Sequence, residues 1–443
     1  MRSKLIALVA VWSLAAVALH AQVVPAQPAT SDARAASATI SLTLADALAR
    51  AKANSPQFQA ALMQAGLARE DRVQARAALL PNIDYNNGFL YTQGNGTASG
   101  RFIADNGVHE YVSQGAVQQV LGVGQFADYR RTAAAQALAR AKAEIAFRGL
   151  TVAVVQAYYG LEAAQARAAS TQSAYDEAQR FLDMSRQLEQ GGEVAHADVI
   201  KAQIQANDQQ LGAQEAKLAA DNARLNLAVL VFPNFFQDFT LADDLEATST
   251  LPAMNDVQQL AAKNNPELAA AFAALEAANH EVAVARAGHL PSLVLEYLYG
   301  IDANHFAVNT DGFRNLGYAA TATLNIPVWH WGAIESKVKQ AELQQHQAKV
   351  ELSAAQRQAV ADLKSFYAEA ETARGQLNLL HTSADLAADS LRLTTLRYQA
   401  GEASALEVVD AQNTLTQARS NYSDGALRYH VAIANLQTLT GSF

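Results

Sequence analysis

ARAALLP at residues 75–81 recurs 210 positions later as ARAGHLP at residues 285–291. The residues before the two copies recur as well, because Asn54-Ser-Pro56 is matched by Asn264-Asn-Pro266 at the same displacement. Solenoid repeats span only about 20–50 residues, so this displacement is far too long for one. The sequence therefore predicts one half of a fold that is written twice.

A second pair of matching segments lies further along each half. Gly192-Glu193 returns as Gly401-Glu402 at a displacement of 209, so an insertion or deletion separates the halves. We place the first structural repeat at residues 40–253 and the second at residues 254–443. Two equivalent halves favour a pseudo-symmetric, ring-like assembly.

The composition argues against several classes of function. The net charge is −9 and no run of lysine or arginine occurs, which argues against binding to a nucleic-acid backbone. The hydrophobic half of the chain is rich in alanine, which suits closely packed helices. The chain has no cysteine, so it has no disulfide framework and no thiol for lipid attachment.

The N-terminus has the pattern of a secretory signal. Arg2 and Lys4 precede an apolar stretch at 5–19, which is shorter than the roughly 20 residues of a membrane-spanning helix. We assign residues 1–21 to a signal peptide and residues 22–39, rich in Ala, Pro, Ser and Gln, to a disordered leader. The alternative is a retained membrane anchor.

Two long stretches without proline predict very long helices. Proline is absent between residues 82 and 232 and again after Pro327. A helix of about 65 residues would measure roughly 100 Å and must lie beside others rather than fold over a compact core. The predicted helices are 125–190 and 331–400, which turn at Gly191-Gly192 and Ala400-Gly401 into returning helices at 195–230 and 404–439.

Between the prolines and the long helices, apolar and polar residues alternate as in membrane β-strands. The alternation is clearest from Leu316 to Ile326. The predicted strands are 83–91, 111–121, 293–299 and 316–326, of which 111–121 alternates poorly and is assigned by its place in the repeat. The segments 94–100 and 302–312 are predicted loops.

Four strands cannot close a barrel, and open strand edges cannot face lipid. If the strands lie in a membrane, the chain must oligomerise, and three copies would supply twelve strands. The alternative is a soluble sheet packed on helices. It explains neither the exposed long helices nor the export signal.

The order and repetition of these segments resemble the TolC family of outer-membrane efflux and secretion channels. The resemblance covers residues 40–441. The segments that carry it are Leu80-Pro81, Leu290-Pro291, Asn325-Ile-Pro327-Val-Trp329, Arg397-Tyr398-Gln-Ala-Gly401 and Glu407-Val-Val-Asp410-Ala411-Gln412. Each fragment alone is weak, whereas their order, spacing and repetition are specific.

The resemblance implies a mainly α fold with a β part. Four strands per chain would complete a 12-stranded barrel in the outer membrane of a Gram-negative type envelope, continuous with a trimeric α-barrel across the periplasm. It implies a passive homotrimeric channel, without enzyme activity, that contacts outer-membrane lipid. A periplasmic adaptor and an inner-membrane transporter would complete a tripartite pump, or a type I secretion system, that exports small molecules or proteins.

The resemblance also places a lumen constriction at Glu407 and Asp410. The two acids are three residues apart, so they share a helix face. A ring of six carboxylates would attract cations, and mutual repulsion would raise some of their pKa values. The alternative for Glu407 is a capping box with Ser404, and for Asp410 an ordinary solvated surface acid.

Asp198 and Tyr398 match family positions that tie neighbouring helices together in the closed state. The family has an arginine two residues after the tip glycine, and Ala403 stands at that position here. The salt-bridge part of this gate latch is therefore missing or relocated. The alternatives are that Asp198 stabilises the first turn of its helix and that Tyr398 belongs to the core.

The turns between the long and returning helices match the tips that meet the adaptor. The predicted adaptor-contact residues are Gly191, Gly192, Glu193, Gly401, Glu402 and Ala403. A purely conformational role of the glycines, which end helices by accepting positive φ, is compatible with that contact.

No pattern predicts catalysis, a cofactor or a metal site. The ten histidines are scattered, and Gly122-Val-Gly124 lacks a dinucleotide-binding context. Trp329-His330-Trp331 fits an interfacial belt or a helix junction better than a ligand cage. The rival functions are a periplasmic coiled-coil scaffold or adaptor without a pore, and an exported hydrolase.

Overall fold

The computed structural model describes residues 40–91, 109–234, 237–243, 245, 251–310 and 312–441. The predicted signal peptide, the leader and the loop at 94–100 lie outside the described residues. The first repeat contains β1 (Ile40–Leu42), α1 (Leu44–Asn54), α2 (Pro56–Ala77), β2 (Asn82–Tyr91), β3 (His109–Leu121), α3 (Val123–Gln190), α4 (His196–Val231) and β4 (Phe239–Leu241). The second contains α5 (Met254–Asn264), α6 (Pro266–Ala287), β5 (Ser292–Ala303), β6 (Asn309–Thr310), β7 (Phe313–Arg314), β8 (Leu316–Asn325), α7 (Ala333–Gln399) and α8 (Ala405–Thr440).

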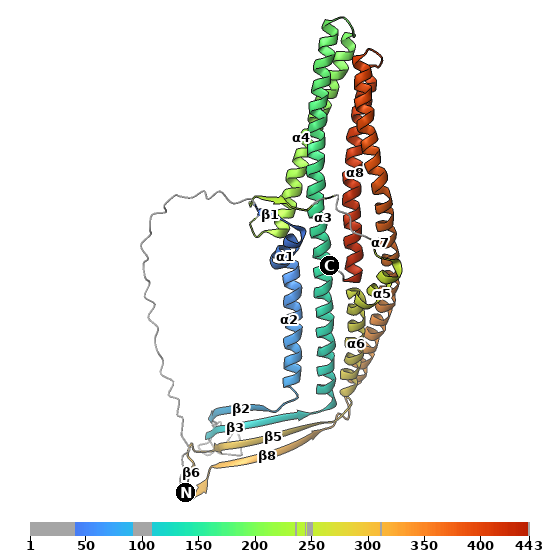
Figure 1. The fold of residues 1–443 in the computed structure, drawn as a ribbon. Coiled ribbons are helices and arrows are strands. Elements are labelled where there is room, and N and C mark those ends of the chain that lie inside the picture. Colours follow the sequence, from blue (N-terminus) through green and yellow to red (C-terminus); the bar gives the residue numbers. More distant parts are fainter. Residues whose placement is uncertain are drawn as a thin grey trace, which may run out of the picture. The chain divides into compact units, whose positions relative to one another are not determined.

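The predicted long helices and the four predicted strands are confirmed (Figure 1). The helix α3 has 68 residues and α7 has 67, so each is about 100 Å long at 1.5 Å per residue. Their returning partners, α4 and α8, have 36 residues each. Many of their buried residues are alanines, whose small side chains let neighbouring backbones approach closely.

Two helices precede each strand pair, α1 and α2 in the first repeat and α5 and α6 in the second. Pro56 and Pro266 stand at the first positions of α2 and α6, where the missing N–H costs nothing. The preceding residues cap the new helices, because Ser55 accepts from the Phe58 N–H at 3.3 Å and Asn265 from the Glu267 N–H at 2.9 Å. A cap followed by proline ends one helix and begins the next.

Two short strand pairs were missed by the sequence analysis. β1 pairs with β4 in parallel, which joins the two ends of the first repeat. The predicted loop at 302–312 is partly wrong, since β5 continues to Ala303 and the pair β6 and β7 follows it. Strands of two or three residues are too short to show an alternation.

The four long strands form one antiparallel sheet in the order β2-β3-β5-β8. Directly paired residues share a face, and one face is mostly apolar. Its large side chains include Ile83, Tyr85, Phe89, Val117, Leu295, Tyr297, Tyr299, Tyr318 and Leu324. The opposite face carries the four acids of these strands, Asp84, Glu110, Glu296 and Asp302, and the strands contain neither lysine nor arginine.

The duplication extends to individual hydrogen bonds. The Asn54 side-chain amide donates to the Val231 carbonyl at 2.8 Å, which ties the end of α1 to the end of α4. In the second repeat, Asn264 donates to the Thr440 carbonyl at 2.9 Å and ties α5 to α8. The two halves therefore share tertiary contacts as well as element order.

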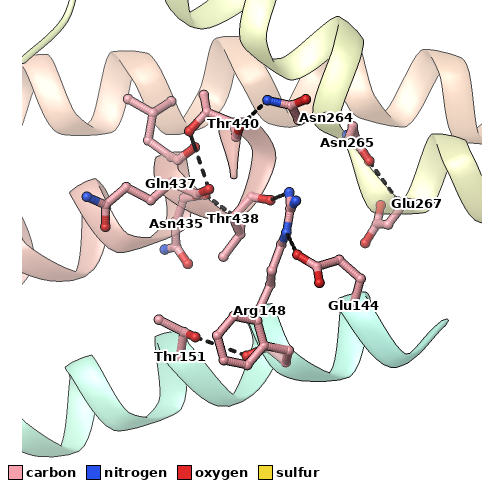
Figure 2. A network of polar contacts seen from close by, with 12 residues as sticks. Glu144, Arg148, Thr151, Asn264, Asn265, Glu267, Asn435, Gln437, Thr438 and Thr440 are labelled. Atoms are coloured by element: carbon pink, nitrogen blue, oxygen red, sulfur yellow. Dashed lines mark hydrogen bonds and ion pairs between the residues drawn. The ribbon is translucent and has the colours of Figure 1, made fainter. Parts of the chain in front are cut away.

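The two repeats also contact each other at the C-terminal end of α8, which packs against α3 (Figure 2). The buried Arg148 guanidinium donates to Glu144 at 2.8 Å and to the Thr438 carbonyl at 2.6 Å. A cation at this point satisfies a carbonyl that α8 leaves free and opposes the negative end of its dipole. Gly441, with φ +73°, leaves room for the guanidinium, because a Cβ there would lie 2.8 Å from Nη2.

Within one chain, the elements form a wall with two edges. In the half of the helical part next to the sheet, neighbouring helices contact in the order α2, α3, α6, α7. In the half towards the hairpin tips, the order is chiefly α4, α3, α8, α7. The strands β2 and β8 pair on one side only among the described residues. One edge of the wall therefore consists of β2, α2 and α4, and the other of β8 and α7.

Replacing Tyr158 with phenylalanine is expected to destabilise the protein by about 1–3 kcal/mol. Its fully buried hydroxyl donates to the Leu42 carbonyl at 2.9 Å and accepts from the Asp243 N–H at 3.3 Å. Burial raises the pKa of Tyr158 to about 12, so it remains a donor. The midpoint of denaturant unfolding, followed by circular dichroism, measures the loss.

The matched control is Tyr367→Phe in the second repeat. Tyr367 donates to the Pro252 carbonyl at 3.3 Å in an exposed setting, so its loss should cost less than about 1 kcal/mol. Equal losses in the two variants would contradict the explanation by burial.

Candidate functional site

The two hairpin tips have the same backbone conformation. Gly192 has φ +77° and Gly401 has φ +75°, both in the left-handed region. The Glu193 N–H donates to the Leu188 carbonyl, and the Glu402 N–H donates to the Arg397 carbonyl, at 2.9 and 2.8 Å. With the glycine N–H bonds to the carbonyls one residue later, these contacts form a Schellman motif at each tip.

The predicted tip residues lie at the surface of these turns. Gly191, Gly192, Glu193, Gly401 and Glu402 are exposed, and Ala403 is half-buried. Among the described residues, no atom lies within 4 Å of the position that a Cβ on Gly192 or Gly401 would take. Both tips are thus accessible in one chain, as an adaptor contact requires.

Glu407 makes the capping box that was the alternative explanation for it. Its carboxylate accepts from the Ser404 N–H at 3.0 Å, and its own N–H donates to the Ser404 hydroxyl. Arg397 adds an ion pair at 3.3 Å and also donates to the Glu402 carbonyl. These bonds fasten the start of α8 to the end of α7.

The bonds to Glu407 set the sign of its pKa shift. The Ser404 backbone N–H, then the Ser404 hydroxyl and Arg397, lower the pKa of Glu407 below its ordinary value. Within one chain this is opposite to the rise expected from mutual repulsion in a ring. Glu407 is therefore an ionised carboxylate paired with a cation rather than a free charge.

Asp410 differs from Glu407 in its surroundings. It is exposed one helical turn further along α8, and its carboxylate makes no bond among the described residues. Its backbone carbonyl accepts from Thr414. Of the two predicted constriction residues, Asp410 carries the uncompensated charge.

The expected bond between Tyr398 and Asp198 is not formed within the described chain. Tyr398 is 3 % exposed and its hydroxyl lies 3.2 Å from the hydroxyl of Ser185. Asp198 instead pairs with Lys201, one turn along α4, at 3.3 Å. The alternatives for both residues describe their surroundings better, since Tyr398 packs edge-on against Phe181 and Asp198 lies in the first turn of α4.

The sequence analysis missed Ser185 and the role of Arg397. Ser185 is fully buried in α3, and it joins the first hairpin to the second through Tyr398. Arg397 stood in a quoted motif, directly before Tyr398, and its position close to the turn was a signal that it could reach across it. Arg397 supplies a cation at the tip of the second hairpin, where Ala403 replaces the arginine of the family.

A groove of about 660 Å³ lies beside the tips, between α3, α7 and α8. Its lining includes the apolar side chains of Phe181, Leu391 and Leu415. The charged side chains that line it are Arg180, Arg419, Arg392, which pairs with Asp389 at 3.5 Å, and Glu177. The Oε1 atom of Gln412, which also lines it, is buried and has no hydrogen-bond partner in the part of the chain that the structure describes. The groove offers cations and an acceptor next to an apolar surface.

The described residues contain no group of three His, Cys, Asp or Glu side chains that could hold a metal ion. None of the described helices combines the length and the apolar character needed to cross a membrane.

Comparisons with known proteins agree with the duplicated architecture. The family model described as outer membrane efflux protein matches residues 47–231 and 257–442, one segment in each repeat. The chain is 26% identical to the outer membrane protein TolC of Vibrio cholerae over 90% of both chains. It is 28% identical to the alkaline protease secretion protein AprF of Pseudomonas aeruginosa, over 90% of this chain and 84% of that protein.

The fold agrees with a solved channel structure. The CmeC outer membrane channel of Campylobacter jejuni superposes with a TM-score of 0.80 at 18% identity, covering 90% of this chain and 85% of that one.

Proposed function

Because the chain belongs to the family of outer membrane efflux proteins, we propose that three copies of it close into one passive export channel. The protein is an outer-membrane channel protein of the TolC type and not an enzyme. The family supports the channel over the rival scaffold and hydrolase. In the proposed assembly, the sheets complete a twelve-stranded barrel whose apolar face contacts lipid, and the helices continue its wall.

The observation that carries this proposal is a pair of exposed apolar stripes on the two helical edges. The α4 stripe consists of Ile204, Leu211, Leu218 and Leu225, and the α7 stripe of Leu379, Leu386 and Leu393. Both repeat every seven residues, as in a coiled coil. Each of these side chains is at least half exposed in the single chain.

The stripes face away from the helices that each edge already contacts. Leu211 lies two residues before the buried Ala213, which is about 200° round the helix. Leu379 lies two residues after the buried Leu377, with the same result. A helix in a closed ring needs contacts on two opposite sides. In the proposed ring, the α7 stripe of one copy packs against the α4 stripe of the next copy and covers its exposed apolar side chains.

We place the adaptor contact at the two tips and the neighbouring groove. The turns at Gly192 and Gly401 are exposed, and Arg180, Arg392 and Arg419 line the groove beside them. These features suit a helical partner with acidic side chains. An inner-membrane transporter would supply the energy, because the channel has no chemistry of its own.

The test of the function is ion conductance of the purified protein in planar lipid bilayers, together with its mass in detergent. A trimer that conducts would support the channel. A monomer without conductance would refute it.

Breaking the contact between Tyr398 and Ser185 is expected to raise basal channel opening. A hydrogen bond contributes about 0.5–1.5 kcal/mol, so its loss should shift the equilibrium between the open and closed states of each subunit by roughly 2- to 12-fold. Tyr398→Phe and Ser185→Ala remove the same bond. Single-channel recording should therefore give the same increase for either variant and no further increase for both together.

The matched control is Asp198→Asn, which removes a carboxylate that does not contact Tyr398 in the described chain. It should leave basal opening unchanged. Silent Tyr398 and Ser185 variants would show that this bond does not hold the closed state.

A further inference from the structure

The two strand hairpins of the sheet determine how the duplication maps one half onto the other. The pair β2 and β3 sets Asn82 opposite Gln118, and the pair β5 and β8 sets Ser292 opposite Asn325. The repeat therefore moves β2 onto β5 by 210 positions and β3 onto β8 by 207 positions.

The seam inside the chain shows how one repeat joins the next. β3 pairs with β5, and Gln119 lies opposite Leu295 while Leu121 lies opposite Leu293. β2 has already ended at this level, since its first residue, Asn82, pairs with Gln118. Residues 119–121 thus pair with the following repeat alone.

Applying the displacements moves this seam to the open edges. Gln119 and Leu121 map to Ile326 and Val328, just after the last residue of β8. Leu295 and Leu293 map to Tyr85 and Ile83 at the start of β2. In the described chain Ile326 and Val328 belong to no strand, and they are 60 % and 85 % exposed. Their counterparts in the first repeat, Gln119 and Leu121, belong to β3 because β5 of the second repeat pairs with them.

We infer that β8 extends to Val328 in the assembly and pairs with β2 of the neighbouring copy in a single register. Val328 lies opposite Ile83 of the partner subunit, and Ile326 lies opposite Tyr85 of the partner subunit. The inference rests on the proposed closed trimer and adds the register of its strand seam. Pro327 is compatible with it, because only one strand flanks it there and proline is tolerated at such edges.

The faces of the sheet agree with this register. Ile326 and Val328 continue the alternation of Leu324, and Ile83 and Tyr85 share the same apolar face. A slip of one residue would put apolar side chains opposite the polar face and is excluded. Slips of two residues keep the faces and are the alternatives to be tested.

The absence of cysteine makes disulfide mapping direct. Four double variants of the full chain combine Ile83→Cys or Tyr85→Cys with Ile326→Cys or Val328→Cys. Directly opposite residues have Cα atoms about 4.5–5.5 Å apart, whereas disulfides need about 4.4–6.8 Å and diagonal neighbours are about 7–8 Å apart. Within one chain β2 and β8 are separated by two strands, so any disulfide joins different copies.

The expected result is a covalent trimer on non-reducing gels for 83 with 328 and for 85 with 326, and little of it for the crossed combinations. A stronger product from 83 with 326, or from 85 with 328, would overturn the register while leaving the trimer intact. Trimers by mass in detergent without any disulfide would also overturn it. On the gels the four single-cysteine variants and the unchanged protein should not form covalent trimers. A monomeric mass in detergent for these proteins would instead refute the proposed assembly.

Discussion

Replacing Leu211 and Leu218 of the α4 stripe with glutamate is expected to abolish the trimer. Both side chains are about 60 % exposed in the single chain, at 59 % and 61 %, so the isolated fold tolerates the change. Fully burying a leucine contributes about 1.5–3 kcal/mol, and about 60 % of each side chain remains to be buried, so each subunit interface would lose about 2–4 kcal/mol. Two carboxylates without partners would add a further cost of desolvation.

The measurement is the mass of the protein in detergent, together with its conductance in planar bilayers. The matched control is Gln210→Glu with Lys217→Gln, which makes the same change in net charge at exposed positions of α4 that lie about 100–120° round the helix from the stripe. The control should form conducting trimers. A stripe variant that still assembles would place the subunit interface on another face of α4.

The sequence predicted the long elements because each carried a signal along its whole length. The proline-free stretches set the limits of α3 and α7 to within a few residues, and the alternation from Leu316 to Ile326 located β8. β1 and β4 have three residues each, and their pairing depends on chain segments about 200 residues apart. No local pattern can reveal such a pair.

The break between α1 and α2 was accessible from the sequence but was not used. Ser55 before Pro56, and Asn265 before Pro266, are a capping residue followed by a proline at the first helical position. Each pair specifies the start of a new helix, α2 in the first repeat and α6 in the second.

The site was predictable in position but not in its contacts. The tip glycines and the capping box of Glu407 follow from short local patterns, and both are present. The partner of Tyr398 depends on how the first hairpin is rotated against the second. Rotation brings Ser185 of α3, rather than Asp198 of α4, to its hydroxyl. Local sequence does not encode that angle.

The hydrogen bonds from Ser404 to Glu407, with Arg397, also determine how the tip of the second hairpin responds to pH. Its pKa is lowered in the folded chain, so its stabilisation of the tip is fully present above the ordinary pKa of a glutamate. The stabilisation is lost as the pH falls through the lowered folded value. The tip of the second hairpin should therefore stay fastened at neutral and mildly acidic pH.

Asp410→Asn is expected to lower the preference of the channel for cations over anions by on the order of tenfold. Threefold symmetry would place three of these carboxylates in one narrow ring, and a unit charge contributes about 1 kcal/mol at 4 Å even in bulk water. The measurement is the reversal potential in a salt gradient across a planar bilayer. Some preference should remain, because the acids on the polar face of the strands are unchanged.

The comparison variant carries Arg397→Gln together with Glu407→Gln, which removes both charges of the ion pair and leaves the net charge of the tip as it was. Glutamine at position 407 can still complete the capping box. Its selectivity should stay close to that of the unchanged protein, whereas Glu407→Ala with Asp410→Ala should lose at least as much as Asp410→Asn. Equal selectivity in Asp410→Asn and the unchanged protein would mean that Asp410 does not face the narrow part of the lumen.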